Sequence, residues 1–184
     1  MAAHPADVVN FWREAGEKRW FEKDPAFDDA IRLKFEPSHH AAARGEYDAW
    51  IETAEGALAL LILLDQFPRN LYRGSAHQFA TDSIARKIAA EAIARGHDHS
   101  FANDMRQFFY LPYAHSEDMA DQDRGVALCQ AQADEAGDPE LVKGALIHRF
   151  IIHRFGRFPH RNRALGRTAT PQEQEFLDAG GFAG

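Results

Sequence analysis

Two segments of this chain combine a Phe-Pro step with an Arg-Asn pair. They are Asp65-Gln66-Phe67-Pro68-Arg69-Asn70 and Arg157-Phe158-Pro159-His160-Arg161-Asn162, and each follows a long apolar run. An arginine side chain presents a planar fork of N–H donors that matches carboxylate and phosphate groups. We therefore expect two apolar helices to end in these Arg-Asn corners and to present their cations, together with Arg73, to one shared pocket.

The second corner lies in a strongly basic stretch. Such crowding is unfavourable through like-charge repulsion unless carboxylates or a bound anion offset it. The preceding stretch from Glu117 to Glu140 is acidic. Neutralisation between the two stretches is therefore the alternative to anion binding. Between Leu141 and Gln172 the sequence has no Asp or Glu, and its cations are Lys143, Arg149, Arg154, Arg157, Arg161, Arg163 and Arg167.

The segment His115-Ser116-Glu117-Asp118 suggests a second kind of chemistry. Ser116 can cap the helix that follows, with Glu117 and Asp118 in its first turn. Backbone N–H groups at such a helix start favour anions, and a His-Glu pair can exchange protons with a substrate. The alternative is a helix cap with a solvated acidic turn.

Motifs for metal ions and common catalytic centres are missing from the sequence. The chain has 10 His, but no His-Glu-x-x-His or Cys-x-x-Cys motif. Gly-x-Ser-x-Gly and Gly-Lys-Ser/Thr are also absent. Cys129 lies in an apolar helical stretch and is expected to be a small core residue. We therefore predict no metal and no cofactor.

The clustered arginines and the missing catalytic motifs favour a binding module. Its corners would hold an anionic group of a small molecule or a peptide, and a protein partner is also compatible with this interpretation. The predicted ligand-binding residues are Asp65, Arg69, Asn70, Arg73, His115, Glu117, His148, Arg154, Arg157, Arg161 and Asn162.

Two alternatives remain open. In the first, the chain is an enzyme that acts on a phosphorylated or carboxylated metabolite, where His115 or His148 moves protons and Glu117 or Asp65 orients the imidazole. Its anion would be held by Arg69, Arg154, Arg157 and Arg161. In the second, these residues are a purely structural scaffold. At the first corner, the arginines and Asn70 would then satisfy free carbonyl groups of the helix end.

Composition limits the class of protein. The chain has 184 residues, so residues 1–184 are expected to form a single domain. Its net charge of −7 argues against nucleic acid as a partner. The longest apolar run, Ala57 to Leu64, is too short to span a membrane. A single Cys and no signal-peptide pattern predict a cytoplasmic protein.

Helical signals recur along the chain and no strand-like alternation persists, so we predict an all-α fold of about seven to ten helices. Pro37 and Phe67-Pro68 are each expected to end a helix, and Leu58 to Leu64 should form the buried central helix. Asp24, Asp138 and Thr170 are expected caps, each followed by proline. The remaining predicted helices are 76–95, 104–110, 116–136, 138–155 and 170–178, before a loose tail at about 180–184.

Seven motifs follow one another along the chain. They are Phe11-Trp12, Trp20-Phe21, Phe27-Asp28, Leu63-Leu64-Asp65-Gln66-Phe67-Pro68-Arg69-Asn70, Phe79-Ala80-Thr81-Asp82, Tyr113-Ala114-His115-Ser116-Glu117-Asp118 and Phe155-Gly156-Arg157-Phe158-Pro159-His160-Arg161-Asn162. In this order they resemble the bacterial family known as domain of unknown function 924. The resemblance covers essentially the whole chain and implies a tetratricopeptide-like array of antiparallel helical hairpins, without an assigned activity. One departure is Tyr113-Ala114, where a Pro-Leu-Glu-like lead to the histidine is expected; it removes a carboxylate.

Overall fold

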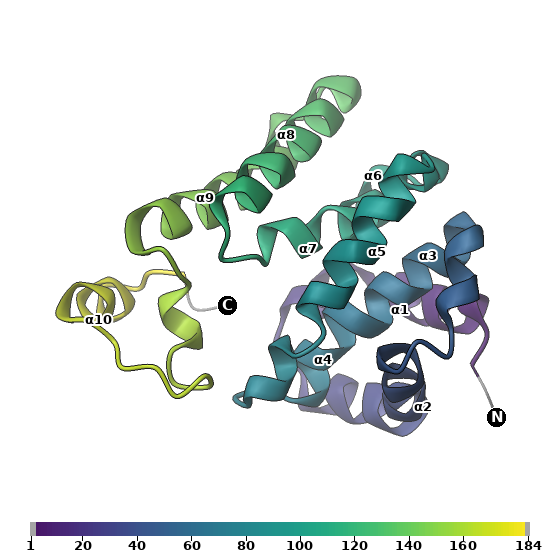
Figure 1. Ribbon diagram of the computed structural model, residues 1–184, viewed down its shortest axis with the longest axis horizontal. Coiled ribbons are helices and arrows are strands. Elements are labelled where there is room, and N and C mark those ends of the chain that lie inside the picture. Colours follow the sequence, from purple (N-terminus) through teal and green to yellow (C-terminus); the bar gives the residue numbers. More distant parts are fainter. Residues whose placement is uncertain (1–2, 183–184) are drawn as a thin grey trace. The chain divides into compact units, whose positions relative to one another are not determined.

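The chain is built from helices and short helical turns, which can be followed in Figure 1. The computed structural model describes residues 3–182, and no strand occurs among them, so the all-α prediction is confirmed. The chain divides into two compact units: unit 1 is Met1–Arg73 with His77–Pro112, and unit 2 is Gly74–Ala76 with Tyr113–Gly184. Each unit is described by itself, and the expected single domain stays a prediction.

Unit 1 is organised around α3, which packs against α1, α5 and the 3-10 turn η1. Every residue from Leu58 to Leu64 is at most 1% exposed, as expected for the central helix. The elements of this part of the chain are α1 (Pro5–Phe21), α2 (Pro25–Ala43), η1 (Asp48–Glu52), α3 (Ala54–Leu61), the π-helical turn η2 (Ile62–Gln66), α4 (Phe67–Leu71), η3 (Ala76–Phe79), α5 (Asp82–Ala94), η4 (His97–Ser100), α6 (Asn103–Arg106) and η5 (Gln107–Phe109).

Unit 2 is organised around the pair α8 and α9, which pack against each other. Gly137 and Gly156 end α8 and α9 in the left-handed conformation, as their positions in the sequence predict. The elements are α7 (Leu111–Ala114), which begins in unit 1, then α8 (Met119–Ala136), η6 (Pro139–Val142), α9 (Lys143–Phe155), η7 (Pro159–Arg161) and α10 (Pro171–Asp178).

The predicted caps at Asp24 and Thr170 are confirmed. The Asp24 side chain accepts the N–H groups of Ala26 and Phe27 at the start of α2. Thr170 caps α10 in a reciprocal box with Glu173. Both helices place proline directly after the cap. An N–H at this position would have no acceptor within the helix, so its absence in proline costs nothing.

The prediction that Pro37 ends a helix is wrong, because α2 continues to Ala43. A proline removes the hydrogen bond to the carbonyl four residues earlier, which here belongs to Leu33. Leu33 is 85% exposed, so this carbonyl lies on the solvent side of the helix. Beyond the proline, the buried Ala41 and Ala42 keep the last turns of α2 packed against the core.

The prediction that Phe67-Pro68 stops the central helix is also wrong. The chain continues from α3 through the π-turn η2 into α4, so Pro68 lies within one continuous helical path. Proline cannot donate to the Leu64 carbonyl, and the Thr81 hydroxyl donates to that oxygen instead, at 2.5 Å. The neighbouring Leu63 carbonyl accepts a 2.8 Å hydrogen bond from His39 Nδ1. Long-range donors therefore replace the local bonds that the proline and the π-turn remove.

Ser116 is not the N-cap of the helix that follows it. The cap of α8 is Asp118, whose carboxylate accepts the Ala120 N–H at 2.7 Å. The Ser116 hydroxyl accepts the Asp118 N–H at 3.2 Å and donates to Asp121 at 2.6 Å. Glu117 consequently lies before the helix, where its carboxylate can bind other elements of unit 2.

The fully buried Leu61 gives a test of the central helix. Leu61→Ala should lower the free energy of unfolding by about 2–5 kcal/mol through the lost transfer energy and the cavity left behind. Urea unfolding measures this loss. Leu33→Ala is the control, since Leu33 is 85% exposed and should change stability by less than about 0.5 kcal/mol. Similar losses for both variants would contradict a central position for Leu61.

The Thr81 hydroxyl tests how the proline is accommodated. Thr81→Val retains the shape of the side chain but leaves the buried Leu64 carbonyl without its donor, so stability should fall by about 1–3 kcal/mol. Thr168→Val is the matched control, because Thr168 is exposed. Equal unfolding midpoints for wild type and Thr81→Val would show that this hydrogen bond contributes nothing.

Candidate functional site

In unit 1, Arg69 is surrounded by acceptors from the protein itself. Its guanidinium donates to both carboxylate oxygens of Asp82, at 3.2 Å each, and to the main-chain carbonyl of Asp65. The Asp65 carboxylate lies 3.5 Å away and is fully buried. Burial opposes the charge of Arg69, but Asp65 and Asp82 outweigh it and raise the pKa of the guanidinium.

Asn70 and Arg73 converge on Asp28, in the first turn of α2. The Asn70 amide donates to Asp28 Oδ1 at 2.7 Å, and Arg73 binds the same carboxylate through two hydrogen bonds of 2.6 and 3.0 Å. The Arg-Asn corner of unit 1 therefore holds the start of α2. These contacts favour the structural interpretation of this corner, and ligand binding by it stays a prediction.

The second Arg-Asn motif repeats this arrangement within unit 2. Asn162 donates to Glu173 at 3.3 Å, and Arg157 binds the same carboxylate through hydrogen bonds of 2.6 and 2.8 Å. Glu173 lies in the first turn of α10. In both units, an Asn and an Arg thus clamp a carboxylate at the start of a helix that begins with proline. The asparagine therefore has the same role in the two motifs, whereas the arginine of the clamp follows Asn70 in unit 1 and precedes Asn162 in unit 2.

Glu173 is buried, with 2% of its surface exposed. Hydrogen bonds from Arg157 lower its pKa to about 2, with a further contribution from the Thr170 N–H, which donates at 2.7 Å. Because the carboxylate is ionised and fully hydrogen-bonded, it neutralises Arg157. This pair therefore supplies no free anion-binding group to the surface of unit 2.

Glu117 forms the second carboxylate clamp of unit 2. It accepts the Phe158 N–H at 2.8 Å and two hydrogen bonds from Arg167, at 2.7 and 3.0 Å. Arg167 also donates to Asn162 and to the Phe158 carbonyl. Burial opposes ionisation of Glu117, but these donors outweigh it and lower the pKa of the carboxyl group. Arg167 was not among the predicted site residues, although it belongs to the basic stretch.

Several cationic donors and imidazoles gather around Phe158 in unit 2. The Arg161 guanidinium lies 4.4 Å from the centre of the Phe158 ring. The rings of His148 and His160 lie 5.6 and 5.5 Å from it. Phe182 contacts both imidazoles, at 4.8 and 5.3 Å. We call Phe158, Arg161, His148, His160 and Phe182 the Phe158 cluster.

The predicted site residues of unit 2 are divided between the clamps and this cluster. His115 lies beside the cluster, with its ring 6.1 Å from that of His148. Arg154 is exposed and stacks on Phe155 and Phe176, at 4.7 and 5.7 Å. Sequence analysis missed His160 and Phe182, although His160 lies inside the motif. Phe182 falls in the expected loose tail, of which residues 183–184 lie outside the described part of the chain.

The two Arg-Asn corners belong to different units. Arg69 and Asn70 lie in unit 1, whereas Arg161 and Asn162 lie in unit 2. The idea that they border one pocket stays a prediction.

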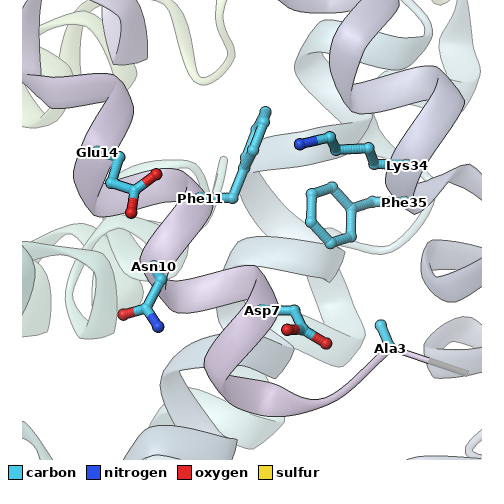
Figure 2. Close-up of a pocket in the computed structure, with 7 residues that line it drawn as sticks. All are labelled: Ala3, Asp7, Asn10, Phe11, Glu14, Lys34 and Phe35. Carbon is cyan, nitrogen blue, oxygen red and sulfur yellow. The ribbon is translucent and has the colours of Figure 1, made fainter.

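An open groove in unit 1 contains none of the predicted site residues. It has a volume of about 420 Å³ and lies between α1 and α2, as Figure 2 shows. Phe11 and Phe35 line it, and the Lys34 ammonium lies 5.0 Å from the centre of the Phe11 ring. Its polar residues, Asp7, Asn10 and Glu14, follow one another along α1.

Other kinds of site receive no support within residues 3–182. No group of three or more His, Cys, Asp or Glu there is arranged to hold a metal ion. No helix in the same part of the chain has both the length and the apolar character needed to cross a bilayer. Burial raises the pKa of the Cys129 thiol to about 11, so this side chain is not an activated nucleophile.

The described chain is thus an all-helical protein with a basic, aromatic-lined cluster in its second unit. Residues 8–181 match a family described as bacterial protein of unknown function (DUF924), and the chain belongs to this family. A similar solved structure is that of the protein of unknown function ATU0120 from Agrobacterium tumefaciens, with 50% identity and a TM-score of 0.90. The match covers 95% of this chain and 97% of that one. No curated protein matches the chain significantly.

The Glu173 clamp predicts a defined dependence of stability on pH. Its pKa of about 2 in the folded protein lies below the ordinary value of 4.5. The ionised form therefore stabilises the fold above pH 4.5, and this contribution is lost as pH falls toward 2. Wild type should have a higher free energy of unfolding than Glu173→Gln. Urea unfolding should show that this difference is constant near pH 6 and shrinks below about pH 4.5.

The matched control for this prediction is Glu175→Gln. Glu175 lies on the same helix and is exposed. This variant should follow the pH profile of the wild type. If Glu173→Gln has the same pH profile as both, Glu173 is not a clamped carboxylate.

Proposed function

We propose that this chain is a binding protein whose Phe158 cluster holds an anionic group of a small molecule or a peptide. One observation carries the proposal: Arg161 and two imidazoles, of His148 and His160, surround one aromatic ring. Guanidinium and protonated imidazole groups are strong donors to carboxylate and phosphate. The ring supplies an apolar surface beside them.

The surroundings of the cluster are rich in arginine. Glu117 and Glu173 are bound by Arg167 and Arg157. Arg161 also helps to lower the pKa of Glu117. Arg161 is only 6% exposed, and a cation at such a position favours the approach of an anion.

The tetratricopeptide-like arrangement of helical hairpins is part of the same proposal. In such arrays, a ligand is commonly held on a surface that several helices share. The hydrogen bonds of Glu117 go to Arg167 and the Phe158 N–H, and Asp65 accepts from Gln66. These contacts favour a structural role for both carboxylates.

The decisive variant is Arg161→Gln, which removes the charge and retains hydrogen-bonding capacity. Binding of inorganic phosphate and of citrate should be measured by calorimetry at constant ionic strength. Wild type should bind at least one of them. Arg161→Gln should lose at least about tenfold in affinity, as expected for a charge-assisted hydrogen bond worth about 1.5–3 kcal/mol.

Arg163→Gln is the control, because Arg163 lies in the same basic stretch and is exposed. His148→Gln should also weaken binding. His153→Gln is its control, since His153 is exposed on the same helix. Circular dichroism establishes that each variant is folded. The proposal fails if neither anion binds the wild type, or if Arg163→Gln weakens binding as much as Arg161→Gln.

A further inference from the structure

Phe182 is the most exposed member of the Phe158 cluster. It is 36% exposed, whereas Phe158 is 1% exposed. The Phe182 ring lies 4.8 Å from the ring of His148 and 5.3 Å from that of His160, with angles of 78° and 76° between the ring planes. Such nearly perpendicular contacts are a favoured geometry for pairs of aromatic rings. One phenyl ring therefore packs in the same way against both imidazoles.

The two imidazoles belong to separate elements. His148 lies in α9, and His160 lies in η7, beyond the end of that helix. The buried Phe158 contacts both of them as well, at 5.6 and 5.5 Å. Each imidazole thus has a buried phenyl ring and a partly exposed one as neighbours. A side chain that packs on functional groups from two elements restricts their rotamers and their relative position.

The end of α10 determines where Phe182 lies. The Gly181 N–H donates to the Phe176 carbonyl at 2.9 Å, and the Gly180 N–H donates to the Leu177 carbonyl at 3.0 Å. Gly180 has a φ of 79°, in the left-handed region. These hydrogen bonds and this conformation define a Schellman motif, which sets the direction in which the chain leaves the helix. Phe182 is the next residue, so the motif directs it to the imidazoles.

Gly181 has no room for a side chain. A Cβ at this position would lie 2.5 Å from the carbonyl oxygen of Phe176 and 2.6 Å from its ring. The Phe176 ring packs against Phe155 at 5.2 Å and against the buried core of unit 2. Because the carbonyl belongs to the backbone of α10, it cannot move aside without disturbing the helix. A larger residue in place of Gly181 would therefore displace the segment that carries Phe182.

We propose that Phe182 is a positioning residue of the anion site, which holds the imidazoles of His148 and His160 in the orientation that contacts the ligand. This inference rests on the proposed function, because the imidazoles are there assigned to an anion. Hydrogen bonds are directional, so an imidazole that rotates freely loses part of its interaction with the ligand. The Phe182 ring restricts this rotation on both imidazoles. The Schellman motif of α10 is then part of the binding site.

The test measures binding of inorganic phosphate and of citrate by calorimetry. Phe182→Ala removes the ring, and Phe182→Tyr retains it. Gly181→Ala retains the ring but displaces it. Gly144→Ala is the matched control for the glycine substitution, because a Cβ at Gly144 meets no atom within 4 Å. Circular dichroism establishes that each variant is folded.

Phe182→Ala and Gly181→Ala should each weaken binding of the anion by about tenfold, as is typical of residues that orient a ligand-binding group. Phe182→Tyr and Gly144→Ala should bind like the wild type. In a protein that also carries His148→Gln and His160→Gln, Phe182→Ala should cause no further loss, because Phe182 acts through the imidazoles. A merely structural role would give the same loss in both backgrounds.

Nuclear magnetic resonance of the imidazole protons of His148 and His160 provides a readout without ligand. Phe182→Ala and Gly181→Ala should shift both sets of signals, because the ring current of Phe182 is removed or displaced, and Gly144→Ala should not. Unchanged signals in Phe182→Ala would overturn the inference, as would equal or tighter anion binding by this variant, or equal losses in both backgrounds.

The two proposals can be told apart when one of them fails. If the wild type binds neither anion, the proposed function fails, and the role of Phe182 in an anion site fails with it. If the wild type binds an anion and Arg161→Gln weakens this binding, but Phe182→Ala does not, the proposed function stands and only the positioning role is overturned.

Discussion

The arrangement of unit 1 depends on a proline inside its most buried helical path. Pro68 removes the donor that the Leu64 carbonyl would receive in a regular helix, and an unsatisfied buried carbonyl is strongly unfavourable. The chain forms a π-turn directly before the proline, and three consecutive carbonyls, of Leu63, Leu64 and Asp65, accept side-chain donors. These donors come from α2, from the residue before α5 and from α4. The requirement for hydrogen bonds therefore ties separate elements to the central helix.

The irregular part of unit 2 is stabilised differently. Between the end of α9 and the start of α10 the backbone has only the short turn η7. Glu117 and Glu173 hold this segment by accepting the Phe158 and Thr170 N–H groups and by pairing with Arg167 and Arg157. Both carboxylates therefore have a structural role in this segment of unit 2.

The asparagine of the repeated Arg-Asn motif has the same structural role in both units. Each Asn donates to a carboxylate in the first turn of a helix, and an Arg completes the clamp. In unit 1 the motif arginine, Arg69, faces the carboxylates of Asp65 and Asp82. In unit 2 the motif arginine, Arg161, lies over an aromatic ring beside histidines. The two copies therefore place their arginines in different chemical surroundings.

Local features of the sequence were sufficient to predict much of the helical content. The caps at Asp24 and Thr170, the glycines that end α8 and α9, and the buried run from Leu58 to Leu64 follow from interactions within a few residues. Such short-range preferences act in the same way wherever the segment lies in the fold.

The tertiary structure alone decided the features that depend on distant partners. Proline predicted a helix end at Pro37 and at Pro68, but packing and side-chain donors from other elements carry the helices past both positions. The same holds for the candidate site. Residue types identified an arginine-rich region, whereas the choice of which arginine meets a carboxylate depends on residues far away in sequence. Asp28 for Arg73 and Glu117 for Arg167 are examples. No local pattern encodes these pairings, because their free energy arises only when the chain has folded.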